Sequence, residues 1–326
     1  CLTLDVSKTF DENRFLIIFH IKMNLLLTGA FSYSDEQLKQ LSALGYNVYF
    51  MQYETEILPL LACEVDVVVC NGLFLHHDID DFKQLKLVQL ISAGFDRIPV
   101  DIIKSRGIKL MNAKGVYSIP MAEWAMMRVL QYYKKLSHFE KAQIDCNWNK
   151  CRTLREITGI EVAVIGAGNV GQEVAKRFSA FGARLTGFDV HTNATPYFDE
   201  IELINRLFQM VGMYDVVIIT APLTSETYHL ISRKVIKSMK QGAMLVNIAR
   251  GQLIDERALI EVLREDRQDL FVALDVFEVE PLAKESPLWR MKNVVVSPHN
   301  SFVSNCNCKR MFDLIYNNLK LHIHDR

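Results

Sequence analysis

The chain has 326 residues, a length that suits about two domains of ordinary size. Half of the residues are hydrophobic and 23% are charged, so the composition is that of a globular protein and not of a disordered one. Lys and Arg number 37 against 38 Asp and Glu, for a formal net charge of −1. This balance argues against a general binder of nucleic acid or of anionic membranes, because both classes need a basic excess. We predict neither partner.

The N-terminal stretch, residues 15–27, is apolar but is interrupted by polar residues. It is shorter than the ~20 residues that a spanning helix needs, so we predict no membrane segment. The chain opens at Cys1, whereas the regular pattern described below starts at Met23. We therefore predict that residues 1–22 are a non-native or disordered extension.

Neither the cysteines nor the histidines form a recognisable framework. The seven cysteines are odd in number and scattered over a long chain, which is not the pattern of a small disulfide-stapled secreted module. They indicate a reducing, cytoplasmic compartment. The run His76, His77 and Asp78 has no spaced cysteines or carboxylates to complete a metal site, so we interpret it as a solvated helix start and predict no metal.

From Met23 onward, short apolar runs alternate with helical patterns. Ser34 and Gln37 match a capping box that opens a helix, and Gly45 closes it. The strands predicted in this part are residues 24–28, 47–53, 65–70, 87–92 and 108–112. The helices predicted between them are residues 34–44, 57–63, 79–84 and 100–106. Near-continuous apolar strands separated by helices indicate a parallel sheet covered on both faces.

A long helix starting at Pro120, a favoured first-turn residue, leads into a second set of the same kind. The strands predicted there are residues 161–165, 184–188, 215–220, 243–248, 271–276 and 293–297. The predicted helices are residues 169–181, 198–210, 232–239, 256–265 and a last one near 308–322. Six strands in this rhythm are typical of a doubly wound dinucleotide-binding domain. The predicted fold class is α/β, with two doubly wound parallel-sheet domains.

The sequence GAGNVG, a G-x-G-x-x-G pattern, lies between the first strand of the second set and its helix. In this context Gly166 permits a tight turn, Gly168 lets the backbone approach a pyrophosphate, and Gly171 lets helix and strand pack closely. The helix start at Asn169 and Val170 then presents free N–H groups to phosphates. The alternative, an ordinary glycine turn, is disfavoured by the strand before it and the helix after it.

Asp189 ends the next predicted strand, 18 residues beyond Gly171. A carboxylate at this place accepts hydrogen bonds from the ribose hydroxyls of NAD and repels the 2′-phosphate of NADP. The sequence therefore predicts NAD as the cofactor.

Arg250, Glu280 and His299 each follow the carboxyl end of a predicted strand, where open α/β sheets bind ligands. Arginine can hold a carboxylate with two parallel hydrogen bonds. Histidine exchanges a proton near neutral pH, and a carboxylate beside it favours its protonated form. Each residue alone would be read as an ordinary surface charge. Behind a dinucleotide loop, the three together suit hydride transfer between a nicotinamide and the carbonyl of a 2-oxo acid.

The chain closely resembles the D-isomer-specific 2-hydroxyacid dehydrogenase family, over nearly everything after Met23. The stretches that carry the resemblance, in family order, are SAGFDRIP (92–99), GAGNVG (166–171), Asp189, APLTSETYHLI (221–231), NIARGQLIDERAL (247–259), ALDVFEVEPL (273–282) and SPH (297–299). The resemblance implies a flavodoxin-like substrate domain, residues 23–115 plus 301–326. A Rossmann NAD-binding domain, residues 116–300, is inserted into it.

The resemblance also implies roles for single residues. Arg250 binds the substrate, His299 is the acid/base and Glu280 is its partner. Ala93 and Gly94 match the loop whose backbone amides receive the substrate carboxylate. The positions that match cofactor contacts are Gly166, Gly168, Asn169, Val170, Gly171, Asp189, Ala221, Pro222, Thr227, Ile248, Ala249, Arg250 and Asp275.

Other expectations follow from the same resemblance. Such enzymes are usually homodimers joined through the NAD-binding domains, with the long helix near residues 123–133 at the interface. Residues 300–304 lack the small residues usual after the family histidine, so we expect the local loop to differ. The chain also ends earlier than most relatives, which suggests that a short closing segment is missing.

The implied activity is the NAD-dependent interconversion of a small 2-oxo acid and its D-2-hydroxy acid. Formate dehydrogenases are disfavoured, because they carry Gln where this chain has Glu280. The alternative from another class is an NAD(H)-sensing binding protein with little turnover, like the C-terminal binding protein corepressors. The sequence does not name the acid: phosphoglycerate, hydroxypyruvate, glyoxylate and branched 2-oxo acids all stay candidates.

Overall fold

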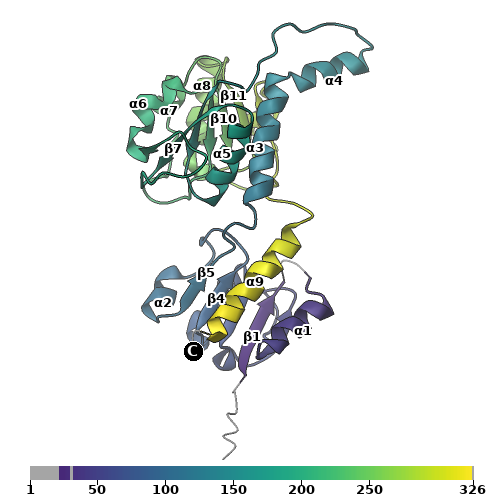
Figure 1. Ribbon diagram of the computed structural model, residues 1–326, viewed down its shortest axis with the longest axis vertical. Helices are drawn as coiled ribbons and strands as arrows, with labels where there is room; N and C mark the ends of the chain where they lie inside the picture. The colour runs from purple at the N-terminus through teal and green to yellow at the C-terminus, as the bar shows by residue number, and fades with distance from the viewer. Residues whose placement is uncertain (1–21, 30–31, 325–326) are drawn as a thin grey trace, which may run out of the picture. The chain divides into compact units, whose positions relative to one another are not determined.

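The computed structural model describes residues 22–29 and 32–324, which form two compact units (Figure 1). Unit 1 contains the described residues up to Gln89, together with Ile98–Leu110 and the residues from Tyr316 on. Unit 2 contains Leu90–Arg97 and Met111–Ile315. The predicted extension, residues 1–22, lies outside the described residues except for Lys22.

Unit 1 is built on a five-stranded sheet in the order β2-β1-β3-β4-β5, the order of flavodoxin-like sheets. Its strands are β1 (Met23–Thr28), β2 (Tyr46–Met51), β3 (Val67–Cys70), β4 (Leu87–Leu90) and β5 (Lys109–Met111). Its helices are α1 (Asp35–Ala43), α2 (Val100–Ser105) and the C-terminal part of α9 (Asn307–His324). The predicted capping box is present, since Ser34 accepts from the Gln37 amide and Gln37 accepts from the Ser34 amide. The apolar β1 residues are buried on both faces of the sheet, as a parallel strand requires.

Unit 2 is built on a seven-stranded sheet in the order β12-β11-β10-β9-β6-β7-β8. Its strands are β6 (Glu161–Ile165), β7 (Arg184–Asp189), β8 (Glu200–Leu203), β9 (Val216–Ile219), β10 (Met244–Asn247), β11 (Phe271–Leu274) and β12 (Val294–Val296). All neighbouring strands run parallel. The strand order reverses between β6 and β9, which is the switch point where doubly wound sheets bind ligands. The predicted fold class, with its Rossmann and flavodoxin-like sheets, is confirmed.

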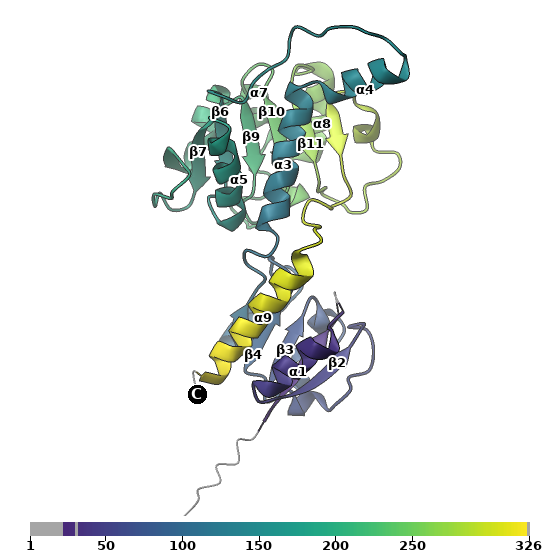
Figure 2. The same ribbon diagram turned by 45° about the vertical axis from the view of Figure 1, so that its right-hand side comes forward.

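Helices cover both faces of the seven-stranded sheet (Figures 1 and 2). One face packs against α3 (Ser118–Tyr133) and α5 (Asn169–Ala180), and the other against α6 (Leu207–Met210), α7 (Arg233–Ser238) and α8 (Glu256–Glu265). After α3 comes α4 (Leu136–Ile144), which projects from the body of unit 2 with the segment that follows it (Figure 2). Within the described ranges, no helix is long and apolar enough to cross a membrane.

Two predicted helices are wrong, and a third is wrong over its first half. Residues 57–63 contain Pro59, whose ring restricts the residue before it, and only a short 3-10 turn, Ala62–Glu64, forms there. Residues 79–84 form only the 3-10 turn Ile79–Asp81, which Asp78 caps by accepting from the Asp80 amide. Residues 198–210 begin with a period-two alternation, and they form the edge strand β8 before a short helical turn. The predicted six strands of the second sheet therefore become seven.

Candidate active site

The carboxyl ends of six neighbouring strands in unit 2 carry the residues that the sequence singles out. The glycine loop follows β6, Asp189 ends β7, and the segment with Ala221 follows β9. The loops after β10, β11 and β12 carry Arg250, Glu280 and His299, and these three strands are adjacent in the sheet. Because parallel strands end at the same edge of a sheet, the fold gathers these loops along one edge.

The glycine loop has the backbone that a dinucleotide requires. Gly166 has a φ of +99°, and a Cβ there would lie 2.7 Å from the backbone of Ala221. A Cβ on Gly171 would lie 2.0 Å from the Gly166 carbonyl oxygen, so only glycine lets α5 approach the loop. Thr220 fastens the turn, since its hydroxyl donates to the Gly166 carbonyl at 2.6 Å.

The start of α5 is open to a ligand. Gly168 is its N-cap, no side chain caps the helix, and no acidic residue lies in its first turn. A Cβ on Gly168 would meet nothing within 4 Å, so the free N–H groups of the first turn face unfilled space. Free amide donors and a positive helix end suit a pyrophosphate, so these residues fit a dinucleotide.

Asp189 turns its carboxylate back toward the glycine loop. One oxygen accepts from the Ala167 amide at 2.7 Å, and the other accepts from the Val190 amide at 2.7 Å. Its negative charge therefore lies beside the phosphate-binding loop, where the adenosine ribose of a bound dinucleotide is expected.

The other predicted cofactor positions line the loops after β9 and β10. Ala221, Ile248 and Ala249 are buried. Thr227 is also buried, and its hydroxyl donates to the Pro222 carbonyl at 2.7 Å while accepting from the Thr224 amide at 2.7 Å. Thr227 therefore stabilises the loop after β9 through hydrogen bonds within that loop.

Arg250 is held by its own loop and by a second segment of unit 2. The buried Asn247 amide group donates to the Arg250 carbonyl at 2.9 Å and accepts from the Ala249 amide at 3.0 Å. The Arg250 guanidinium donates through both Nε and Nη2 to one oxygen of Asp96, each at 3.2 Å. Its Nη1 donates to the Ala249 carbonyl at 2.8 Å.

The segment with Ala93 and Gly94 lies directly against Arg250. A Cβ on Gly94 would lie 2.5 Å from Arg250 Nη2, so a larger residue would displace the guanidinium. Asn112 donates to the Ala93 carbonyl at 2.6 Å, and Ser92 donates to the Gly94 carbonyl at 2.9 Å. Within the described part of the chain, the amides of these two residues donate to no protein acceptor. They are therefore free to receive an anion.

Glu280 and His299 form a direct pair. His299 Nδ1 lies 2.8 Å from Glu280 Oε2, and the other carboxylate oxygen of Glu280 accepts from the Phe277 amide at 3.1 Å. This bond leaves the Nε2 side of the His299 ring available for a ligand. Both side chains are more than a third exposed. In this geometry the carboxylate sets the orientation of the imidazole ring.

Asp275 anchors the loop that carries His299. Its fully buried carboxylate accepts from the amides of Asn300 and Ser301, each at 2.8 Å, and from the Ser297 hydroxyl. Its carbonyl accepts from the His299 amide at 2.7 Å. His299 has a φ of +50°, which is costly for a residue other than glycine, and these bonds on both sides hold it there.

Aromatic rings pack behind His299. The ring of Phe302 packs edge-on against that of His299, with 5.8 Å between the ring centroids. The ring of Tyr117 packs edge-on against that of Phe302, with 5.5 Å between the centroids. Burial raises the pKa of Tyr117 to about 12, so its hydroxyl stays protonated and donates to the Ile91 carbonyl at 2.6 Å. Phe302 lies where the sequence lacks the expected small residues.

Sequence reasoning missed two of these residues. Asn247 was detectable, because it is a polar side chain at the end of the otherwise apolar β10. Asp96 lies inside the stretch that carried the resemblance, but its partner Arg250 is 154 residues away, a pairing that no local pattern indicates.

A family model described as D-isomer specific 2-hydroxyacid dehydrogenase, NAD binding domain, matches residues 126–301. The chain belongs to this family. The match confirms the family that the sequence predicts, the class of NAD-dependent 2-hydroxyacid dehydrogenases, and NAD as the kind of cofactor bound.

Individual family members agree with this result. The D-3-phosphoglycerate dehydrogenase of Methanocaldococcus jannaschii is 35% identical over 72% of this chain, a match that spans only 45% of that relative's own length. The glyoxylate reductase of Thermofilum pendens is 33% identical over 81% of this chain and 76% of its own. A crystal structure of a D-isomer specific 2-hydroxyacid dehydrogenase from Xanthobacter autotrophicus, in complex with NADPH and MES, is 25% identical. It covers 92% of this chain and 96% of its own, with a TM-score of 0.73.

Proposed function

We propose that this dehydrogenase reduces a small 2-oxo acid to its D-2-hydroxy acid, with Arg250, Glu280 and His299 as its catalytic residues. The observation that carries the proposal is the 2.8 Å pair of His299 and Glu280 on the loop edge that also carries Arg250 and the glycine loop. The two named relatives are a dehydrogenase and a reductase, which favours turnover over NAD(H) sensing alone.

Each catalytic residue has a separate task. The bound nicotinamide supplies the hydride. Arg250 and the free amides of Ala93 and Gly94 hold the substrate carboxylate and orient the carbonyl beside it. Reduction turns this carbonyl oxygen into an alkoxide, and His299 donates a proton to it from Nε2. Glu280 stabilises the protonated ring through Nδ1 and keeps Nε2 facing the substrate.

We propose NADH as the preferred reductant. The Asp189 carboxylate beside the glycine loop would repel a 2′-phosphate and can bond the ribose hydroxyls of NAD. For the substrate we propose a short 2-oxo acid such as glyoxylate or hydroxypyruvate. The glyoxylate reductase among the relatives supports this choice.

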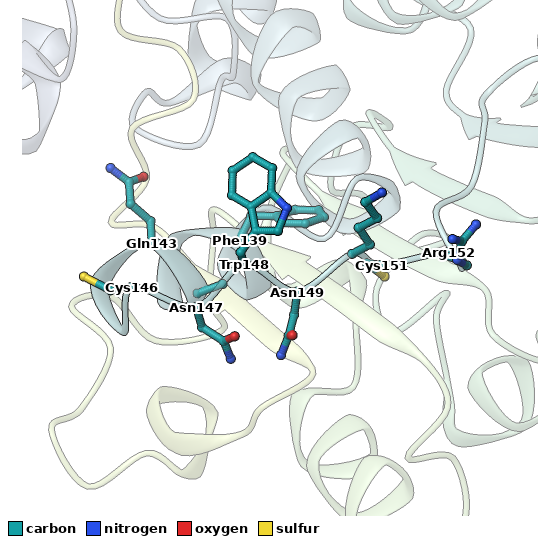
Figure 3. A pocket seen from close by; sticks show the side chains of 10 residues that line it. Phe139, Gln143, Cys146, Asn147, Trp148, Asn149, Cys151 and Arg152 are labelled. Atoms are coloured by element: carbon teal, nitrogen blue, oxygen red, sulfur yellow. The ribbon is translucent and has the colours of Figure 1, made fainter.

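We also propose a homodimer joined through the NAD-binding domains. On α3 and α5, a hollow of about 340 Å³ is lined by mostly apolar residues, among them Met126, Met127 and Phe181. The end of α4 and the segment after it line a second, open hollow of about 750 Å³, where Trp148 is 92% exposed (Figure 3). A second copy would cover these apolar surfaces.

The described cysteines form no disulfide, which supports a cytoplasmic location.

The test is NADH consumption with a panel of glyoxylate, hydroxypyruvate, pyruvate and branched 2-oxo acids, each repeated with NADPH. We expect turnover of at least one short acid, faster with NADH, and a D-2-hydroxy acid as product. NADH binding without turnover on any acid would support the sensor alternative and overturn the proposed function. Equal or faster use of NADPH would overturn only the role of Asp189.

A further inference from the structure

The ion pair between Asp96 and Arg250 is too exposed to contribute much to the stability of the fold. Asp96 keeps 56% and Arg250 33% of its side chain exposed. Pairs that are exposed to this extent contribute little to the free energy of folding. The pair nevertheless joins the loop after β10 to a segment 154 residues earlier in the chain. A geometric role for Asp96 accounts for this arrangement better than a contribution to stability.

The hydrogen bonds of Arg250 divide its five N–H groups in a definite way. A guanidinium is a planar fork with one N–H on Nε and two on each Nη. Nε and Nη2 point along one side of the fork, and both donate to Asp96 Oδ2. One N–H of Nη1 donates to the Ala249 carbonyl. Three of the five donors are therefore occupied.

Of the two donors that remain, one is on Nη1 and one is on Nη2, and the Nη2 donor lies on the end of the fork. A donor at this end can bind an oxygen of a 2-oxo acid. With Asp96 on the side of the fork, a substrate can use only this end. The guanidinium also cannot rotate about its long side chain without breaking two bonds to the same carboxylate oxygen.

The segment that carries Asp96 is itself fixed. Asn112 and Ser92 hold the carbonyls of Ala93 and Gly94 at 2.6 and 2.9 Å. Gly94 has no side chain at the point where one would meet both Arg250 and Asp96, since a Cβ there would lie 2.5 Å from Nη2 and 2.8 Å from Asp96 Oδ2. The carboxylate, the guanidinium and the free amides of this segment therefore keep a set geometry.

We propose that Asp96 is a positioning residue for this reaction, which binds the side of the Arg250 fork and presents its end to the substrate. The inference rests on the proposed function, because it assigns Asp96 a task only through the substrate-binding role of Arg250. Asp96 does not touch the substrate.

The test combines Asp96→Ala and Asp96→Asn with Arg250→Lys in a double-mutant cycle, read as kcat/KM for glyoxylate or the best acid of the panel. Asp96→Ala should lower kcat/KM by about 10- to 100-fold, because a small misplacement of a binding group has effects of this size. Asp96→Asn should fall between the parent and Asp96→Ala, since the amide oxygen still accepts but carries no charge. NADH affinity and Tm should stay unchanged.

The decisive result is the double variant. Lysine has no fork to orient, so adding Asp96→Ala to Arg250→Lys should lower kcat/KM by less than about 3-fold further. The matched control is Asp313→Ala, which removes a carboxylate that is 53% exposed from the ion pair with Lys309 and should leave kcat/KM unchanged.

The outcomes separate the two claims. If the parent turns over no acid of the panel, the proposed function fails and the role of Asp96 fails with it. If the parent is active but the losses of Asp96→Ala and Arg250→Lys multiply, Asp96 does not act through Arg250 and only this inference is overturned. A fall in Tm and NADH affinity that accompanies the loss would show a structural role and would overturn it equally.

Discussion

His299 is held by contacts on both sides of its backbone and by Glu280 at its ring. Asp275 binds the loop through carbonyl and carboxylate, and the left-handed backbone of His299 is the consequence. Strain of this kind persists only where the surroundings impose it, and it concentrates at functional sites. The proposed proton donor is thus held at its backbone and at its ring.

Replacing Glu280 with Gln should lower kcat/KM for reduction. The Glu280 carboxylate lies 2.8 Å from His299 Nδ1 and sets the orientation of the ring that is proposed to deliver the proton. Gln keeps a similar shape but removes the charge, so kcat/KM should fall by about 10-fold or more. The measurement is kcat/KM of parent and variant at one pH, with Tm and NADH affinity unchanged.

The control for this prediction is Glu285→Gln, at an exposed glutamate in the same segment, whose kcat/KM should match that of the parent. An unchanged kcat/KM for Glu280→Gln would mean that Glu280 does not orient His299 for the reaction.

At the scale of single residues, the sequence could predict the strand-end positions but not their partners. Arg250, Glu280 and His299 follow apolar runs that are readable as strands, so their place on the loop edge was predictable. The bond from Asp96 to Arg250 depends on how two distant loops meet, and the anchoring of residues 297–301 by Asp275 depends on a backbone geometry that residue types do not reveal.

At the scale of elements, buried parallel strands were predictable and exposed edges were not. The central strands are continuous apolar runs, whereas β8 is a partly exposed edge strand whose charged residues resemble a helix surface. Short segments such as residues 57–63 carry too few residues to distinguish a helical period from a loop.

The glycine loop offers a matched pair of substitutions. A Cβ on Gly168 meets no protein atom and its φ of −71° suits alanine, so Gly168→Ala should leave Tm unchanged. It should still weaken NADH binding by about 10-fold or more, because the methyl group fills the space for the pyrophosphate. Gly171→Ala places a Cβ 2.0 Å from the Gly166 carbonyl, so it should lower both Tm and NADH affinity.

Tm and NADH titrations of both variants check this prediction. A lower Tm for Gly168→Ala, or normal NADH binding by it, would show that the loop does not hold the pyrophosphate as described.

Arg267 and Asp269 fasten the end of α7 to the start of β11. Arg267 donates to carbonyls at the end of α7, including Lys237 at 2.8 Å and Met239 at 2.9 Å. Its side-chain hydrogen bonds to Asp269 lower the pKa of that carboxyl group to about 2. A depressed folded-state pKa stabilises the fold above the unfolded value of about 4. This stabilisation is lost as the pH falls toward 2.

Asp269→Asn should therefore lower the free energy of unfolding of unit 2 by about 1 kcal/mol at pH 7, a value reduced for solvent screening. This corresponds to a Tm lower by about 2–4 °C, and the difference should shrink between pH 4 and pH 2. Calorimetry at several pH values measures this difference in Tm. The control is Asp266→Asn, which removes an exposed ion pair with Lys237 and should have a smaller effect. A difference that does not change with pH would rule out the titration of Asp269 as its cause.

At the scale of the whole molecule, two sheets of different strand order arise from one chain whose first unit is discontinuous in sequence. The sequence predicts both sheets because each repeats the strand–helix rhythm. It does not predict α4 and the projecting segment, whose large apolar side chains are exposed and so give no signal of a local core.

The exposed apolar side chains of the projecting segment and of α3 lead us to expect a dimer in solution. The protein should sediment with about twice the 37.5 kDa mass of one chain. Trp148→Ser, combined with Met127→Glu, should shift the equilibrium toward the monomer, because both side chains are exposed on the proposed interface. Trp289→Ser, at an exposed tryptophan elsewhere in unit 2, is the matched control. A parent that sediments as a monomer at all concentrations would contradict the proposed dimer.

We propose that this chain reduces a 2-oxo acid and that Arg250 binds the substrate. The most direct measurement is kcat/KM of the parent and of Arg250→Lys with NADH and the best acid of the panel. The parent should turn over at ~1–10³ s⁻¹. Arg250→Lys should lose about 10²-fold or more in kcat/KM, about 3 kcal/mol, with NADH binding unchanged. A parent that binds NADH but reduces no acid would rule out the proposed reaction, and an Arg250→Lys variant with unchanged kcat/KM would rule out Arg250 as the residue that binds the substrate.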